Sequence, residues 1–388
     1  MAKILGLENA YLYCTGDRIL DFGIMPELPS EYYQSSRIVN AADRLVLPGY
    51  CDSHTHLVFA GSRENEFIDK IKGLSYDEIA KRGGGILNSA RLIHETSEKD
   101  LYDQSVIRIM EIMFQGTVAV EIKSGYGLTT EDEIKILRVI KRIKRDFPLT
   151  VKSTFLGAHT FPLKYRDNRS GYLDLIINEM IPAISREGLA DFIDVFCDKG
   201  FFSPGETAKI LKAGLNHGLI PKIHANELDY SGGIQVGIDN KALSVDHLEF
   251  TNDDEIRALL ESSTMPTLLP GASFFLGLNY APARKMIDSG LPVALASDFN
   301  PGSSPSGNMN FIVSLGSIKL KMFPEETLNA VTLNGAYAMG VEKDHGTISP
   351  GKYASFIITK KISGIEFLPY AFGSDHIENV FVKGIQVR

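Results

Sequence analysis

The 388-residue sequence has no tryptophan and only three cysteines. Cys14, Cys51 and Cys197 are too few and too scattered for a disulfide framework, which favours a reducing compartment. Cys197 could be a nucleophile, but no partner base is evident beside it, so we interpret it as a small buried side chain. The sequence also lacks the apolar core of a signal peptide and any apolar run near the roughly 18 residues of a membrane span. We therefore expect a cytoplasmic protein with no membrane partner.

The sequence also has fewer basic than acidic residues. Lys and Arg number 40 against 48 Asp and Glu, which gives a net charge of −8. No overall field attracts nucleic acid, so an acidic chain that binds an anionic substrate must place its cations locally. With 44% hydrophobic and 23% charged residues, the composition is that of a globular protein, and the length suits one barrel with a small appendage.

Eight short apolar runs alternate with segments whose apolar residues recur at helical spacing. This alternation predicts an α/β fold of parallel βα units, a (β/α)8 TIM barrel. The predicted strands lie near residues 46–53, 117–123, 149–157, 191–197, 219–224, 242–247, 264–269 and 291–297. The clearest helical patterns cover 131–145, 174–181 and 204–217. We interpret 63–113, with helical patterns at 69–82 and 88–96, as an excursion over the mouth of the barrel.

Strand-like runs also occur near both ends of the chain. They lie at 3–5, 10–13, 37–39, 354–358 and 380–387. Neither group could bury a core alone, so we expect the two ends to pair into one small composite β-domain, similar to a β-sandwich, beside the barrel. The expected domains are residues 1–46 and 346–388 for the two parts of the β-domain and 47–345 for the barrel.

Metal-binding residue types stand where several predicted strands end. His54 and His56 follow the first strand, and their two-residue spacing places both imidazoles on one face. His224 and Asp298 end two further strands, and barrel active sites gather at this end of the strands. Each residue alone could be structural, since a strand-end Asp often caps a turn. Together, three nitrogens and one oxygen predict one Zn²⁺ or Fe ion with room for a water nucleophile.

Longer motifs then point to a family. The runs are HTHLVFAGSRENEF at 54–67, RGGGI at 82–86, KSGYGL at 123–128, GAHT at 157–160, DVFC at 194–197, HANE at 224–227 and SDFNPG at 297–302. Between about Val46 and Gly351, the sequence resembles the imidazolonepropionase family of the amidohydrolase superfamily. The resemblance implies a homodimeric hydrolase that opens 4-imidazolone-5-propanoate, a small anionic heterocycle, to N-formimidoyl-L-glutamate in histidine degradation.

The resemblance also implies catalytic roles. Asp298 is expected to bind the metal and to accept a proton from its water, and Glu227 to contact a ring nitrogen of the substrate. His247 is expected to act as an acid or base near the water. The alternatives for His247 are a fifth metal ligand or a core histidine bonded to Asp246. The alternative for Glu227 is a surface or capping carboxylate, which is what an isolated Glu usually is. His159 is expected to polarise the carbonyl of the substrate ring.

The metal count depends on lysine, because binuclear relatives usually bridge their metals with a carboxylated lysine. Lys152 stands too early in its strand, and Lys199 lies past its strand in a turn-like segment. The sequence therefore favours a single metal ion.

Substrate contacts follow from the same resemblance. Arg63 supplies the bidentate cation that a propionate tail needs, and Tyr76 is expected to help hold that carboxylate. Any single tyrosine is more often a core or interface residue. The other expected substrate contacts are Tyr126, His159, Glu227, Asn300, Gly302 and Ser303.

One position departs from the family pattern, and two rival functions stay open. Lys164 stands where an acidic residue is common, which leaves the packing of the loop after His159 uncertain. One rival is another cyclic amidohydrolase or a heterocycle deaminase, which would not need Arg63 and Tyr126. The other is a scaffold protein without activity, which would not need four filled ligand positions. The remaining histidines are interpreted as surface or structural residues: His94, His217, His345 and His376.

Overall fold

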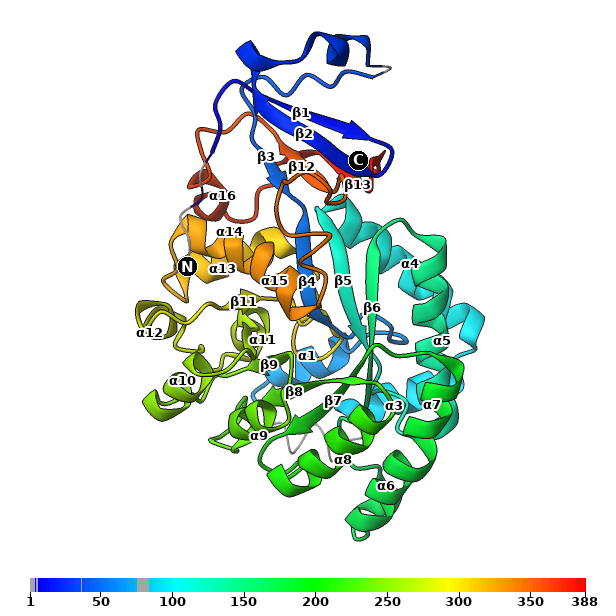
Figure 1. The fold of residues 1–388 in the computed structure, drawn as a ribbon. Helices are drawn as coiled ribbons and strands as arrows, with labels where there is room; N and C mark the ends of the chain where they lie inside the picture. Colours follow the sequence, from blue (N-terminus) through cyan, green and yellow to red (C-terminus); the bar gives the residue numbers. More distant parts are fainter. Residues whose placement is uncertain (1–3, 5, 36, 75–83) are drawn as a thin grey trace.

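The computed structural model describes residues 4, 6–35, 37–74 and 84–388. Eight parallel strands form one sheet in chain order, and a parallel bridge between Thr55 and Phe299 joins its first strand to the segment after its last (Figure 1). The predicted (β/α)8 barrel is therefore confirmed. Its strands are β4 (Tyr50–Thr55), β5 (Thr117–Lys123), β6 (Thr150–Ala158), β7 (Phe192–Cys197), β8 (Ile220–Ala225), β9 (Ser244–His247), β10 (Met265–Leu268) and β11 (Ala294–Leu295).

Helices cover the outside of this barrel and bury one apolar face each. In α5 (Thr130–Asp146), Ile136, Ile140 and Ile143 are fully buried, and Thr129 caps the helix by accepting from the backbone N–H of Asp132. The region predicted as a helix at 174–181 is the middle of a longer one with a π-helical turn, η4 (Ile176–Met180), between α6 (Arg169–Leu175) and α7 (Ile181–Glu187). The others are α8 (Pro204–Asn216), α9 (Gly233–Asp239), α10 (Asp253–Leu260), α11 (Pro270–Leu276), α12 (Ala283–Asp288), α13 (Met309–Ile318), α14 (Pro324–Val331), α15 (Leu333–Ala338) and the 3₁₀ turn η3 (Leu163–Tyr165).

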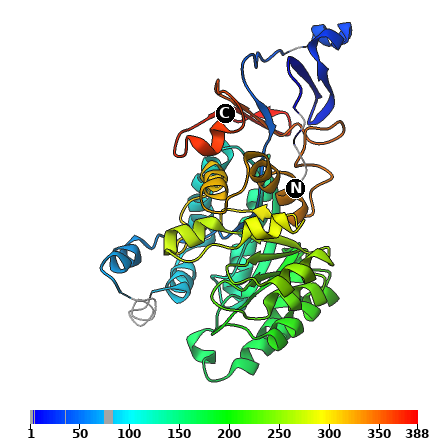
Figure 2. The same cartoon turned by 90° about the vertical axis from the view of Figure 1, so that its left-hand side faces the viewer.

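The excursion predicted at 63–113 is shorter than expected. Its last part forms α4 (Glu98–Phe114), which packs beside α5 and β5 as an ordinary barrel helix. The excursion itself contains α1 (Glu64–Ile71) and α3 (Ile86–Glu95), which project from one side of the barrel in Figure 2. Lys70 of α1 donates to the carbonyl of Gly302 at 3.3 Å, so α1 contacts the loop that follows β11. Most of the helix predicted at 69–82 lies outside the described residues.

The two ends of the chain build the small β-domain that lies beside the start of β4 in Figure 1. The hairpin of β1 (Ala10–Thr15) and β2 (Arg18–Ile24) packs on the sheet β14-β13-β12-β3 through Ile19, Phe356 and Phe381. The strands of that sheet are β3 (Val46–Pro48), β12 (Phe356–Thr359), β13 (Ile377–Val382) and β14 (Ile385–Gln386). Short helices join them: η1 (Met25–Glu27), η2 (Ser30–Gln34) and α16 (Phe367–Tyr370). No helix in the described ranges is long and apolar enough to cross a membrane.

The segment 46–53, predicted as one strand, is divided at Gly49. β3 pairs with β12 in the β-domain, whereas β4 begins at Tyr50 and pairs with β5 in the barrel. A Cβ atom on Gly49 would lie 2.2 Å from Cγ1 of Val118. The chain therefore passes from one sheet to the other where only glycine fits.

Gly49→Ala should lower the melting temperature, because the new methyl group overpacks the buried Val118 at a cost of roughly 1–3 kcal/mol. Gly205→Ala is the matched control, since a Cβ atom at this position of α8 meets nothing within 4 Å. The melting temperature of Gly205→Ala should be unchanged or slightly higher than that of the parent. Thermal unfolding measures both, and equal melting temperatures would show that β5 yields to the added methyl group at no cost.

Candidate metal centre and active site

The four predicted metal ligands meet at the carboxyl end of the barrel strands. The Nε2 atoms of His54 and His56 each lie 3.6 Å from Oδ1 of Asp298, and the Nε2 atoms of His56 and His224 are 3.3 Å apart. His54 Nε2 is buried without a hydrogen-bond partner among the described residues. Burial, with nearby positive groups, holds the pKa of His54 and of His56 well below the usual value, so both are neutral imidazoles. Converging neutral nitrogens beside a carboxylate fit a Zn²⁺ or Fe ion.

Carboxylates behind two of these histidines fix which nitrogen faces the centre. Asp246 Oδ2 lies 2.6 Å from Nδ1 of His54, and Asp194 lies 3.0 Å from Nδ1 of His224. A carboxylate accepts a hydrogen bond, so each Nδ1 carries a proton and Nε2 is the nitrogen turned toward the centre. His54 and His224 are therefore oriented for metal binding by the fold itself.

His247, the last residue of β9, stands between two carboxylates. Its Nε2 lies 3.6 Å from Oε2 of Glu227 and its Nδ1 3.7 Å from Oε2 of Glu249. Burial lowers the pKa of His247, but Glu227, Glu249 and Asp298 outweigh this effect and raise it to about 10. Asp246 pairs with His54 instead, so the alternative of a core His247 bonded to Asp246 is wrong. His247 also falls in a group of close potential ligand atoms with His54, so a fifth-ligand position stays open.

Glu227 follows β8 and faces His247 from a dry environment. Burial raises its pKa to about 7, and the favourable interaction with His247 offsets only part of that rise. Asp198 holds the start of this turn by accepting from the backbone N–H groups of Glu227 at 2.7 Å and of Leu228 at 2.9 Å. A carboxyl group with a pKa near neutrality can either donate or accept a proton at this position.

Tyr126 and His159 form one wall beside the metal ligands. The ring of His159 stacks on that of His56 with a centroid distance of 5.1 Å, and its centroid lies 5.3 Å from that of the Tyr126 ring. Its Nδ1 lies 3.1 Å from the carbonyl of Gly125, an acceptor, so Nδ1 is the protonated nitrogen. Burial lowers the pKa of His159 to about 3, so the ring is neutral and its Nε2 is an acceptor. This tautomer disagrees with the expectation that His159 polarises a carbonyl, because a carbonyl needs a donor.

A buried carboxylate holds the loop that carries Tyr126. Glu133 of α5 accepts from the backbone N–H groups of Gly125, Gly127 and Leu128 at 3.0, 2.7 and 2.9 Å. Burial nevertheless raises the pKa of Glu133. The sequence reasoning missed Glu133, whose only local signal is an acidic residue in the first turn of a predicted helix.

The loop after β11 is held together by its own polar groups. Oδ1 of Asn300 accepts from the N–H groups of Gly302 and Ser303, each at 2.8 Å, and its Nδ2 donates to the Asp298 carbonyl at 2.7 Å. Ser303 Oγ donates to Oδ2 of Asp298 at 3.2 Å. Asn300 therefore shapes the loop, while Ser303 reaches the metal-ligand carboxylate directly. Their predicted contacts with substrate stay predictions.

Arg63 lies across this loop and is already paired. Its Nε and Nη2 donate to Oε2 of Glu66 at 2.9 and 2.7 Å, and both side chains are about nine-tenths buried. A Cβ atom on Gly302 would lie 2.1 Å from Nη1 of Arg63, so the guanidinium occupies the space that this glycine leaves. Lys70, half-buried beside Arg63, adds a second cation that the sequence reasoning missed. Tyr76 lies outside the described residues.

The two lysines judged unsuitable as metal bridges, and the remaining histidines, have their contacts elsewhere in the fold. Lys152 pairs with Asp191, and Lys199 pairs with Asp229 on the surface. Lys164 lies in η3 with its Nζ 5.0 Å from the ring of Tyr165. The histidine contacts are with Asp132 for His94, Ala213 for His217, Thr150 for His345 and Ala371 for His376.

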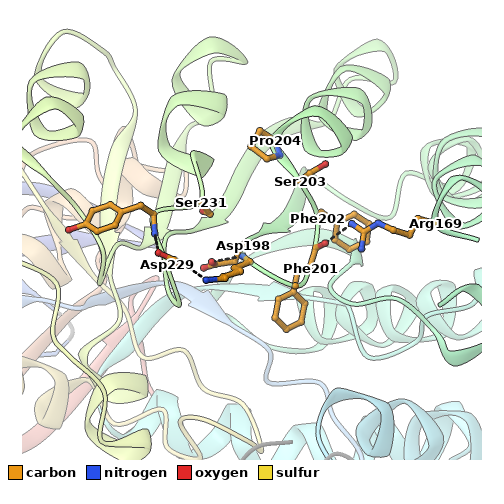
Figure 3. Close-up of a pocket in the computed structure, with 11 residues that line it drawn as sticks. Arg169, Asp198, Phe201, Phe202, Ser203, Pro204, Asp229 and Ser231 are labelled. Carbon is orange, nitrogen blue, oxygen red and sulfur yellow. Dashed lines mark hydrogen bonds and ion pairs between the residues drawn. The ribbon is translucent and has the colours of Figure 1, made fainter. Parts of the chain in front are cut away.

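A surface cavity of about 430 Å³ lies beside the turns that follow β7 and β8 (Figure 3). None of the predicted metal ligands lines it. Two cations line it, and both are paired, Lys199 with Asp229 and Arg169 with Glu206, so neither is free to bind an anionic ligand. The metal centre, with its converging unpaired groups, is the stronger candidate for catalysis.

Comparisons with known proteins agree with this geometry. The model of the amidohydrolase family matches residues 186–387. The imidazolonepropionase of Flavobacterium johnsoniae is 56% identical over 384 residues, which cover 99% of this chain and 93% of the relative. That of Christiangramia forsetii is 53% identical over 384 residues, with the same coverage. A crystal structure of the atrazine chlorohydrolase TrzN from Arthrobacter aurescens TC1, complexed with zinc, superposes with a TM-score of 0.74 over 98% of this chain and 90% of that one.

At 15% identity, the last likeness shows the fold alone. The two relatives show more, because their identity extends over nearly the whole length of both chains. The chain therefore belongs to the imidazolonepropionase family of the amidohydrolases.

Proposed function

We propose that this chain catalyses the reaction of its family with a single divalent metal ion, Zn²⁺ or Fe, held by His54, His56, His224 and Asp298. The reaction is the hydrolytic opening of 4-imidazolone-5-propanoate to N-formimidoyl-L-glutamate in histidine degradation. The observation that carries the proposal is the set of inward-facing Nε2 atoms around Asp298. A metal ion bound there lowers the pKa of a water molecule and so supplies a nucleophile near neutral pH.

Three groups of this chain can then move protons. Asp298 lies against the ligand histidines, and burial raises its pKa, so it can accept a proton at the centre. Nε2 of His247 and Oε2 of Glu227 lie 3.6 Å apart, and both side chains are largely buried. Glu227, with a pKa of about 7, can pass a proton to a ring nitrogen as the ring opens.

The same geometry revises the role of His159. Because its Nε2 is an acceptor, we infer that His159 accepts a hydrogen bond from a ring N–H of the substrate. Its stacking on His56 keeps this acceptor beside the metal centre. Polarisation of the carbonyl would then need a group other than His159.

Recognition of the propionate is assigned to Arg63 and its surroundings. Glu66 occupies one side of the guanidinium, and Nη1 faces the loop at Gly302. Since Glu66 balances the charge of Arg63, Lys70 supplies the excess positive charge that a carboxylate needs. The proposal also places the protein in the cytoplasm as a homodimer, which the resemblance and the cysteine content favour.

His54→Ala and Asp298→Ala should each lose metal and turnover together, because each leaves the metal with an incomplete set of ligands. His217→Ala, at an exposed histidine after α8, is the control and should keep both. Metal content and turnover of imidazolone propionate, beside hydantoin, dihydroorotate and guanine, measure the outcome. Full metal retention with full activity in either ligand variant contradicts the assignment, and turnover of another ring in place of imidazolone propionate contradicts the substrate.

Glu227→Gln should keep the metal and lose rate by roughly 10²–10⁴-fold, because an amide preserves the shape but cannot carry a proton. Any limb of the pH profile at or below about pH 7 that Glu227 causes in the parent should also disappear, since a bound metal ion lowers the pKa of this carboxyl group. Metal analysis and kcat over a range of pH values are the measurements. An unchanged kcat and pH profile would assign Glu227 a structural role.

Arg63→Ala should raise KM more than it lowers kcat and should cost roughly ten- to a hundredfold in kcat/KM, because a charge-assisted contact in a closed pocket contributes about 1.5–3 kcal/mol. Arg63→Lys should recover part of the loss, because a point charge cannot reproduce the fork. Arg91→Ala removes an equal charge at an exposed pair with Glu95 and is the control.

The sharper measurement compares the substrate with an analogue whose carboxylate is an amide. The parent should prefer the carboxylate strongly, and Arg63→Ala should prefer it little. The same preference in both proteins means that Arg63 does not read the tail.

A further inference from the structure

Five charged side chains fill the interior of the barrel behind the metal centre. Each is at most 1% exposed. They come from four strands and alternate with apolar residues that point outward into the helix layer. They are Glu121 and Lys123 of β5, Asp194 of β7, Lys222 of β8 and Asp246 of β9.

Lys123 is the member that joins the three carboxylates. Its Nζ lies 2.6 Å from Oε1 of Glu121, 2.7 Å from Oδ2 of Asp194 and 3.7 Å from Oδ2 of Asp246. Lys222 is equally buried, but among the described groups its Nζ bonds only to Glu121 and, at 3.1 Å, to the carbonyl of Ser53. The two lysines therefore share Glu121 and differ in the carboxylates they contact.

The two carboxylates that Lys123, but not Lys222, reaches within ion-pair distance are those that support metal ligands. Asp194 accepts from Nδ1 of His224 and Asp246 accepts from Nδ1 of His54. A carboxylate in this dry interior could rotate toward other donors, and Ser244 Oγ already donates to the second oxygen of Asp246 at 2.5 Å. An ammonium group between the two carboxylates fixes the rotamer of both at once.

We propose that Lys123 is a positioning residue for the metal centre: through Asp194 and Asp246, its ammonium group holds His224 and His54 with Nε2 toward the metal. This inference rests on the proposed metal ligands and assigns a function to a residue that touches neither metal nor substrate. Burying this many charged side chains is energetically unfavourable unless each has a partner. The proposed role gives a reason why the barrel interior contains them. The alternative is that Lys123 has no positioning role and only compensates buried negative charge, which Lys222 would do equally.

Lys123→Met and Lys222→Met separate these two roles, because each removes one fully buried ammonium from the same network. We expect Lys123→Met to weaken zinc binding by up to about 10–100-fold, the loss seen when a group bonded directly to a metal ligand is removed, because Lys123 supports two such groups at once. Lys222→Met should change the zinc dissociation constant much less. Competition with a chromogenic chelator on the folded apoprotein measures both constants without any assay of activity.

Cobalt substitution adds a readout that a loss of stability alone would not change. The visible d–d spectrum of bound Co²⁺ reports ligand geometry, so it should shift in Lys123→Met and match the parent in Lys222→Met. An unchanged spectrum and zinc constant in Lys123→Met overturn the proposal. Equal weakening of zinc binding in both variants also overturns the proposal, because the loss of buried positive charge would then explain the effect without a specific role for Lys123.

Lys123→Met leaves buried carboxylates uncompensated and could fail to fold. A measurement on the parent then decides: ¹⁵N NMR of the histidine-labelled apoprotein reports which ring nitrogen carries the proton. Nδ1–H tautomers at both His54 and His224 support the proposal. An Nε2–H tautomer at either residue overturns it. The metal-ligand variants described above test the ligands themselves, so a failure of this inference leaves the proposed function intact.

Discussion

Hydrogen bonds from Nδ1 of two histidines to buried carboxylates determine what the site can bind. With Asp246 behind His54 and Asp194 behind His224, each imidazole has its Nδ1 bonded to a carboxylate and its Nε2 turned toward the centre. These Nε2 atoms meet beside Asp298, where the proposed metal ion would bind. The barrel makes this possible because parallel strands bring side chains from distant parts of the chain to one end.

The same dry environment sets the proton chemistry at the mouth. Burial raises the pKa of Glu227 toward neutrality and keeps His159 neutral, while three carboxylates raise the pKa of His247. Groups with pKa values driven apart in this way can serve as separate donors and acceptors. A bound metal ion adds positive charge, which lowers the pKa of the nearby carboxyl groups and of His247.

Backbone segments around the site depend on polar side chains that do not reach the metal. Glu133 accepts from three N–H groups of the loop that carries Tyr126, and Asn300 performs the same task in the loop after β11. Both loops have irregular backbone that needs such acceptors when it is buried. The shape of the substrate site is therefore set largely by residues whose own side chains are occupied.

The sequence by itself determined the barrel and predicted the four residues that we propose as metal ligands. Strand periodicity places His54 and His56 on one face, and His224 and Asp298 end further apolar runs, so local pattern is sufficient to find them. Only the tertiary structure decided that the first apolar segment divides at Gly49, that Arg63 pairs with Glu66, and that Nδ1 of His159 bonds to the carbonyl of Gly125. It alone brought Lys123 to Asp194 and Asp246. The physical reason is that such contacts depend on the register and closure of strands far apart in the chain, which no local pattern encodes.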